Sequence, residues 1–265
     1  MKTTLLLLTF TVGTIFAQQN TPVTSSSTFY DVEDHNDRAF VEFSKNSTQK
    51  LFEAILKENP KIRTASLAVR LYGGNPAPPG RYRLVVIQEG FSLPNTDRLM
   101  TIAPKAVGMS YDEYRNKATS LRKVTGQTLR RRVASTSGDK PVGLAAGDIV
   151  RIDLMKISPD RAADYYNMEQ HDWQPLHAQR VKDGALKSWS VWAVVSPSGS
   201  HREADAVTTQ VYKDFESAMR NPQYTSLYTK LFPDRSLSAL TDRARTVRTI
   251  ERSDFWRVVW AVNRQ

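Results

Sequence analysis

The sequence has 265 residues, no cysteine and a formal net charge of +10, because 37 lysines and arginines stand against 27 acidic residues. Without cysteine the chain can form no disulfide, thiolate metal site or cysteine nucleophile, so its stability must come from an apolar core. The basic balance permits weak attraction to anionic surfaces, but no zinc knuckle, P-loop or aromatic–basic RNA motif accompanies it. We therefore expect no nucleic-acid partner.

The N-terminal residues 1–17 have the pattern of a secretory signal peptide. Lys2 precedes an apolar run that ends at Phe16, and Ala17 is the small residue after which we expect cleavage. No later segment approaches the ~20 consecutive apolar residues that a membrane helix needs. These features predict a secreted or periplasmic protein that makes no membrane contact once the signal is removed. Residues 18–28 are rich in serine and threonine and are predicted to form a flexible leader.

The next part of the chain, residues 29–140, is predicted to be one unit of strands and helices. Its strands are read from apolar–polar alternation and its first helix from an apolar stripe. The expected elements are a weak strand at 27–34, a helix at 36–60, a strand at 64–74, a turn at 75–80, a strand at 81–91 and a basic helix at 110–133.

Residues 147–265 are predicted to repeat this order. A strand is expected at 148–158, a helix at 158–184, a hairpin of strands at 186–196 and 204–212, and a helical stretch from 214. Residues 238–262 read as mostly helical, with room for a final strand. Related triplets support a duplication, since Asp37-Arg38-Ala39 lies 123 positions before Asp160-Arg161-Ala162.

The repeated order predicts an α+β fold of two tandem ferredoxin-like βαββα(β) units. A helical crossover makes the first two strands of each unit parallel, and the hairpin then adds an antiparallel strand. The strand "SWSVWAVV" is apolar on both of its faces, and the helices of a unit cover only one face of the sheet. We therefore expect the two sheets to pack face to face as an intrachain pseudo-dimeric α+β barrel, in a monomer or a homodimer.

Two features resemble a known family, namely the repeated βαββα order and the run "DLMKISPDRAADYYNMEQHDWQPLHAQRVKDGALKSWSVW" in the second unit. Together they resemble the dimeric α+β barrel superfamily in a fused two-unit form, and most closely its NIPSNAP-type members. The resemblance covers most of residues 30–262, but the first unit lacks the "W-x-P-x-H" run. It implies an architecture rather than a reaction, because the superfamily includes cofactor-free monooxygenases, haem-dependent enzymes and isomerases.

The stretch "HDWQPLH" at 171–177 contains two of the four histidines. His171 and His177 are six residues apart, which places them about 120° apart around a helix, so we expect no metal site. Glu169, Trp173 and His177 follow one another at spacings of four and share one stripe of the helix. His177 is therefore a candidate general base with Glu169 as its polar partner. The alternative is that Trp173 belongs to the core and His177 is a hydrogen-bonded residue at its edge.

Candidate ligand-binding residues lie around this stripe. They are the aromatic and basic residues Tyr166, Trp173, Trp189, Trp192 and Arg248. Arginine is included because its guanidinium suits a carboxylate or a phosphate.

Three functions remain open from the sequence. The first is an exported protein that binds a small molecule in an apolar pocket between the two units, without a cofactor. The second is a cofactor-independent oxygenase or isomerase with His177 as general base. The third is a haem-binding protein that uses His171 or His177. Whether the protein is an enzyme is not decided by these patterns.

Overall fold

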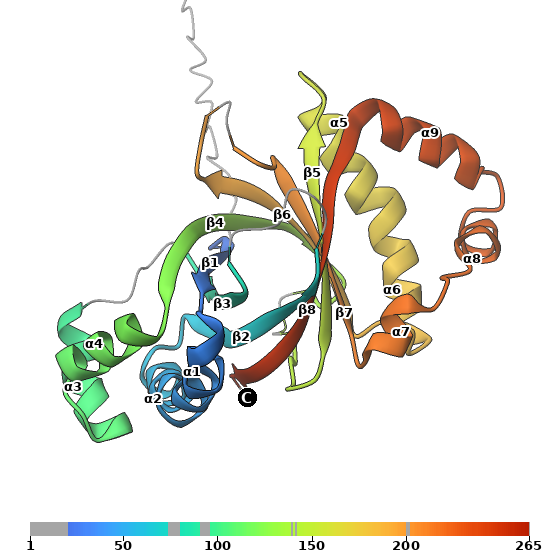
Figure 1. Ribbon diagram of the computed structural model, residues 1–265. Coiled ribbons are helices and arrows are strands. Elements are labelled where there is room, and N and C mark those ends of the chain that lie inside the picture. The colour runs from blue at the N-terminus through green and yellow to red at the C-terminus, as the bar shows by residue number, and fades with distance from the viewer. Residues whose placement is uncertain are drawn as a thin grey trace, which may run out of the picture.

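The computed structural model describes residues 21–73, 80–90, 96–138, 140, 142–199 and 202–264. The predicted signal peptide, residues 1–17, and the first three residues of the predicted leader lie outside this part of the chain. Eight antiparallel strands form one closed barrel, with helices on its outer surface (Figure 1). The strands are β1 (Val23–Asp31), β2 (Ile62–Tyr72), β3 (Tyr82–Glu89), β4 (Lys123–Ser135), β5 (Ile149–Ile157), β6 (Ser188–Ser196), β7 (Ala206–Tyr212) and β8 (Arg248–Asn263).

The strand order around the barrel is β1-β3-β2-β8-β5-β7-β6-β4. The first four strands therefore follow the order β4-β1-β3-β2, and the last four follow the corresponding order β8-β5-β7-β6. The two groups meet at two seams, where β2 pairs with β8 and β4 pairs with β6. The expected face-to-face stacking of two separate sheets is thus replaced by one hydrogen-bonded ring. Closure pairs the edge strands of both groups, which would otherwise expose unpaired backbone groups.

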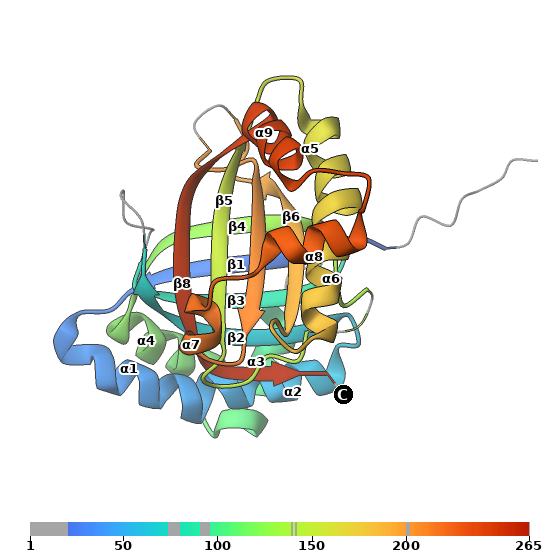
Figure 2. The same cartoon turned by 90° about the vertical axis from the view of Figure 1, so that its right-hand side faces the viewer.

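Helices surround the barrel in two groups. Figures 1 and 2 show α1–α4 gathered beside β1–β4, and α5–α9 beside β5–β8. The helical segments are η1 (Asp34–Asn36), α1 (Asp37–Phe43), η2 (Ser44–Gln49), α2 (Lys50–Glu58), α3 (Thr96–Val107), α4 (Tyr111–Leu121), α5 (Ala162–Met168), η3 (Glu169–Trp173), α6 (Gln174–Lys182), α7 (Phe215–Met219), α8 (Tyr224–Leu231) and α9 (Leu237–Val247). Two of these segments, η2 and η3, are π-helical and continue directly into α2 and α6. None of the helices in the described ranges combines the length and apolar character needed to cross a membrane.

Three expectations from the sequence are corrected by the strands. The predicted leader at 18–28 overlaps β1, which begins at Val23 and pairs with both β3 and β4. The helix expected at 110–133 ends at Leu121, and β4 follows it. The stretch 238–262, expected to be mostly helical with room for a final strand, is helical only as far as Val247, and the remainder forms the strand β8. Serine, threonine and arginine at alternate positions made these strands look polar, because polar side chains occupy part of the barrel interior.

The apolar core is divided between the barrel interior and the layers beneath the helices. Phe40, Leu51 and Ile55 belong to the layer beneath the first helices, where all three are at least 94% buried. The interior contains a smaller apolar cluster that includes Phe29 and Trp256. Most of the apolar burial that stabilises the fold therefore lies outside the barrel, between helices and strands.

Candidate functional site

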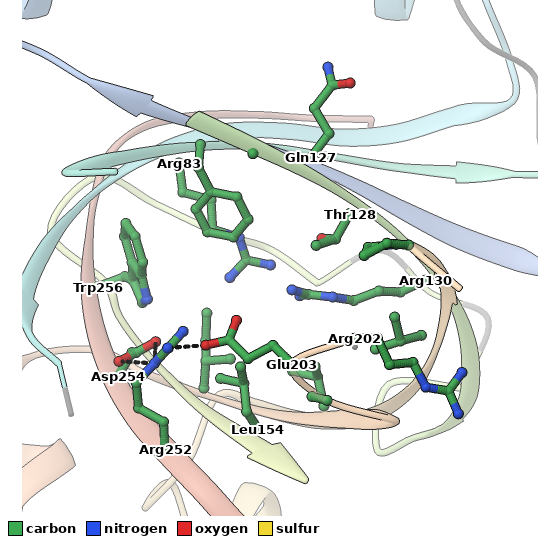
Figure 3. Close-up of a pocket in the computed structure, with 17 residues that line it drawn as sticks. Arg83, Gln127, Thr128, Arg130, Leu154, Arg202, Glu203, Arg252, Asp254 and Trp256 are labelled. Carbon is green, nitrogen blue, oxygen red and sulfur yellow. Dashed lines mark hydrogen bonds and ion pairs between the residues drawn. The ribbon is translucent and has the colours of Figure 1, made fainter. Parts of the chain in front are cut away.

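A cavity of about 200 Å³ lies inside the barrel (Figure 3). One part of its wall is apolar and consists of Phe29, Ile152, Leu154, Val207 and Trp256. These residues come from β1, β5, β7 and β8, so the cavity exists only because the ring of strands is closed. An eight-stranded barrel has an interior just wide enough for side chains or for one small ligand.

Four arginines and two carboxylates also line this cavity. Arg252 donates from its Nε to the Asp254 carboxylate at 3.0 Å and also pairs with Glu203. Arg202 lies at 2.5 Å from Asp205, which neutralises its charge. Each of these two arginines thus has an acidic neighbour.

The other two arginines, Arg83 on β3 and Arg130 on β4, have no carboxylate partner among the residues that the structure describes. Both are 5% exposed. Arg83 donates from Nε and Nη2 to Ser27 Oγ, at 3.1 and 2.8 Å. In Figure 3 the two guanidinium groups point toward one another across the cavity. Two cations thus face each other in a site that is shielded from bulk solvent.

Burial and mutual repulsion disfavour the charged forms of both side chains. The pKa of Arg83 is lowered well below its usual range by burial and by the charge of Arg130, with Asp254 opposing the shift. Burial also lowers the pKa of Arg130 to about 10, against a weaker opposing effect of Glu203. Arginine stays protonated in proteins, so the cost appears as destabilisation of the fold rather than as loss of the proton. An anion placed between the two guanidinium groups would offset that cost.

Three buried polar atoms of the same lining have no hydrogen-bond partner within the described residues. They are Thr128 Oγ1, Arg130 Nε and Trp256 Nε1. Buried polar groups in folded proteins are nearly always hydrogen-bonded, and a missing partner costs about 1–3 kcal/mol. Two unpaired donors and an unpaired hydroxyl therefore belong to residues that line the cavity.

A second and smaller cavity of about 70 Å³ shares Arg83, Arg130 and Trp256 with the first. Hydroxyl side chains dominate its polar lining, namely Ser25, Ser66, Ser188, Ser190 and Thr209. The two arginines therefore line both cavities, the larger one with its charged and apolar walls and the smaller one with its hydroxyl groups. The predicted ligand residue Trp192 lines this second cavity and donates from Nε1 to Ser190 Oγ at 2.8 Å.

The predicted base His177 lies outside the barrel, on α6. It is 4% exposed and its ring stacks on Trp189 at 5.1 Å and on Trp173 at 6.1 Å. Its Nδ1 accepts a hydrogen bond from Arg180 Nη1 at 3.2 Å. Burial, together with the charges of Arg180 and Arg151, holds the pKa of His177 well below its usual range. His177 is thus a neutral side chain within an aromatic stack, and it lines neither barrel cavity.

The remaining predicted residues also lie on the outer side. Glu169 begins η3 and is 3% exposed, and burial raises its pKa to about 7 against the opposing charge of Arg248. Tyr166 packs edge-on against Tyr165 at 5.1 Å. Of the seven predicted site residues, Trp192 alone lines one of these two barrel cavities. The catalytic roles of His177 and Glu169 stay predictions.

A haem group does not fit either barrel cavity. Haem iron is held by histidine, cysteine, methionine or tyrosine, and the described lining contains none of them. His171 lies on the outer surface in an open depression with Asp172, and its Nδ1 is hydrogen-bonded to the Asn167 carbonyl at 2.9 Å. Within the described ranges, no three histidine, aspartate or glutamate residues lie close enough together to hold a metal ion.

Sequence reasoning missed Arg83 and Arg130. A signal was present in "RYRLVVIQ", where Arg83 shares a face with Val85 and Ile87, and all three line the smaller cavity. A cation within an apolar stripe is unusual and marks a position where charge is buried. The run "LRRRV" concealed Arg130 between a leucine and two other arginines.

No family model matches the chain, and no curated protein matches its sequence. Solved structures resemble it in fold. One is a candidate monooxygenase from Lactobacillus acidophilus, at 7% identity, a TM-score of 0.53 and coverage of 92% of this chain and 96% of that one. Others are an anthrone oxidase-like protein (11% identity, TM-score 0.49, 92% and 94% covered) and a haem-binding protein from Thermus thermophilus (8% identity, TM-score 0.45, 89% and 91% covered).

The protein thus has a mixed α+β fold built on an antiparallel closed barrel of eight strands, as in the dimeric α+β barrel proteins. At these identities the likeness concerns the fold alone, and a fold does not determine a reaction.

Proposed function

We propose that this protein binds a small organic anion inside the barrel. One observation carries the proposal: Arg83 and Arg130 are buried and face one another without a carboxylate partner among the described residues. Two buried cations are unfavourable in isolation, and a positioned anion reverses that balance by accepting hydrogen bonds from both.

The lining also indicates what kind of anion fits. Four arginines stand against the lining carboxylates Glu203 and Asp254 and against Asp205, which pairs with Arg202, so a surplus of one positive charge (4 − 3 = 1) remains around the cavity. A carboxylate suits the planar fork of a guanidinium, and Thr128 Oγ1 and Trp256 Nε1 offer further hydrogen bonds. The apolar wall with Phe29 and Leu154 suits a ring or a short hydrocarbon body. The ligand class is thus a small aromatic or alicyclic carboxylate.

The two-unit organisation is part of the same proposal. Both groups of four strands have the same order, and both contain a π-helical segment, which begins at Ser44 in one and at Glu169 in the other, 125 positions later (169 − 44 = 125). These features support a duplicated ferredoxin-like unit that forms an internal pseudo-dimer. The NIPSNAP-like character of the second unit is proposed on its sequence run alone. Export through residues 1–17 is proposed on the sequence pattern alone.

The oxygenase or isomerase alternative can use the same cavity, since its substrates also have aromatic bodies. His177 lies outside the barrel, so its role as general base requires a substrate bound against α6. We expect His177→Phe to leave carboxylate binding in the barrel unchanged. The haem alternative is tested by titrating the purified protein with haem, for which we expect no Soret shift because the barrel lining offers no axial ligand.

The test of the proposal compares benzoate with benzamide. The two molecules have nearly the same shape, but only benzoate carries a charge, so calorimetric titration of the full chain should detect benzoate alone. Arg130→Met and Arg83→Met should each weaken benzoate binding about tenfold or more, because a hydrogen bond to a charged group contributes about 1.5–3 kcal/mol.

A suitable control is Arg63→Met, which removes an arginine that is already paired with Glu89 at 2.8 Å. It should leave benzoate binding unchanged. Equal affinity for benzoate and benzamide, or full benzoate affinity in both cavity variants, would show that the arginine pair does not bind the ligand.

A further inference from the structure

A second basic hollow lies on the outside of the barrel and is lined by residues from the end of α6, from α7 and from α8. Figure 2 shows α8 against α6. Its volume is about 430 Å³. It is separate from the barrel cavity, because the two linings have no residue in common.

The inner wall of this hollow includes Arg180, which is only 5% exposed. Its Nη1 donates to Tyr224 Oη at 2.9 Å and to Gln210 Oε1 at 3.3 Å, and it lies 3.2 Å from His177 Nδ1. All of these partners are neutral, and the described residues offer Arg180 no ion pair. The guanidinium is therefore oriented by hydrogen bonds while its charge stays uncompensated.

The rim adds more positive charge. Lys213, Arg220 and Lys230 are exposed and line the hollow, whereas Asp183 is its one acidic lining residue within the described chain. Asp183 already accepts a hydrogen bond from Gln179 at 2.7 Å. Arg220 is paired with Glu216 at 3.1 Å, which leaves Arg180 and the two lysines as the principal charges.

The corresponding helix beside the first four strands shows that the fold does not require an arginine here. The two π-helical segments begin 125 positions apart and the helices that follow them begin 124 apart, so Arg180 corresponds to Ile55 or Leu56 (180 − 125 = 55; 180 − 124 = 56). Both are apolar, 6% and 5% exposed, and pack in an ordinary apolar core. A buried cation at this position of an otherwise similar helix costs stability and fills no packing need that an apolar side chain does not fill. Its placement is better explained by a ligand.

We propose that this hollow is a binding site for a phosphate group, either free or as a phosphomonoester. Arg180 would bind the oxyanion at the inner wall, held in place by Tyr224, while Lys213 and Lys230 act as flexible point charges at the rim. Phosphate is favoured over a monocarboxylate because three cations surround the hollow and a phosphate carries about two negative charges at neutral pH. Pro222 and Leu227 line the same hollow and provide an apolar contact for the organic part of an ester.

The test is a calorimetric titration of the full chain with inorganic phosphate and with phenyl phosphate, at constant ionic strength in a buffer without phosphate. Lys213→Ala combined with Lys230→Ala should weaken phosphate binding about tenfold or more, since a unit charge at ~4 Å contributes about 1 kcal/mol even in water. Both lysines are exposed, so this double variant should fold normally. Arg180→Met should abolish binding, and its circular dichroism spectrum checks that it folds.

Lys45→Ala combined with Lys50→Ala is the matched control, because it removes the same charge from exposed positions beside the first strands. This variant should bind phosphate normally, as should Arg130→Met in the barrel. Phenyl phosphate bound more tightly than phosphate supports an ester as the natural ligand, whereas equal binding supports the free ion. Phosphate binding that is unchanged in the Lys213/Lys230 variant would overturn the proposal. So would phosphate binding that is lost only in Arg130→Met, or the absence of binding at millimolar phosphate.

Discussion

Replacing Arg130 by methionine should make the unliganded protein more stable, although the substitution lies in the middle of the structure. Arg130 is 5% exposed, its Nε has no hydrogen-bond partner among the described residues, and Arg83 faces it with the same charge. Methionine retains most of the unbranched side-chain volume but has no charge to bury. The variant therefore removes an unfavourable group while it preserves most of the packing.

The size of the effect follows from the pKa of Arg130. Burial lowers this pKa from its usual range to about 10, and one pKa unit corresponds to about 1.4 kcal/mol, so the charged side chain costs the folded state at most about 3 kcal/mol. Because the unfolded chain binds the proton more tightly, this cost is fully present below pH 10 and fades as the pH rises above 10. At pH 7 we expect Arg130→Met to raise the free energy of unfolding by about 1–3 kcal/mol. For a chain of this length that corresponds to roughly 3–10 °C in Tm.

The measurement is urea denaturation followed by circular dichroism, with thermal unfolding as a second probe. Arg63→Met is the control with the opposite expected sign. It breaks the ion pair with Glu89 and should lower the free energy of unfolding by up to about 1 kcal/mol. A loss of about 1 kcal/mol or more in Arg130→Met, with an unchanged m-value, would refute the reasoning, since it would mean that the guanidinium has a favourable partner inside the protein.

Three further predictions concern pH and ligand linkage. Glu169 holds its proton more tightly in the folded chain, where its pKa is about 7, than in the unfolded chain, where it is 4.5. The free energy of unfolding should therefore fall by up to about 3 kcal/mol between pH 4.5 and about 8. Urea titrations of Glu169→Gln should lack this decline. The pKa of His177 is lowered in the folded chain, so the free energy of unfolding should fall as the pH drops below 6.5. His177→Phe should remove this fall. Equal acid sensitivity of the wild type and the variant would contradict the prediction. Benzoate at about 100 times its wild-type Kd should stabilise the wild type by about 2.7 kcal/mol and Arg130→Met by no more than about 1.4 kcal/mol, as thermal shift would detect.

The sequence predicts the outer layers of this fold better than its barrel seams. The stripe with Phe40, Leu51 and Ile55 predicts the first helix because apolar residues recur at helical spacing and are buried together. β4 and β8 are harder to recognise, since inward positions such as Arg130 and Arg252 interrupt the apolar alternation that marks a strand. The seams then depend on pairs of residues at least 55 positions apart (190 − 135 = 55), which local patterns do not encode.

The candidate site is hidden from the sequence for a related reason. Histidine and tryptophan in one helix are conspicuous and attract a functional prediction, but the structure places His177 in a neutral aromatic stack outside the barrel. Arg83 and Arg130 look like ordinary surface cations when read alone. Their importance is visible only in the closed barrel, where both side chains point inward. A sequence pattern does not show that a buried arginine faces another arginine instead of a carboxylate.

Stability and the proposed ligand binding depend on different layers of this molecule. Small interior residues such as Ser25 and Ser66 leave space where larger apolar side chains would fill the barrel, and the two arginines add charge that costs free energy. Such an interior persists only because the helix–strand layers, with Phe40 and Leu51, supply enough apolar burial to hold the ring closed. A protein that needed its barrel only as a scaffold would gain stability by filling it. The retained space and charge are therefore best understood as a binding site maintained at the expense of stability.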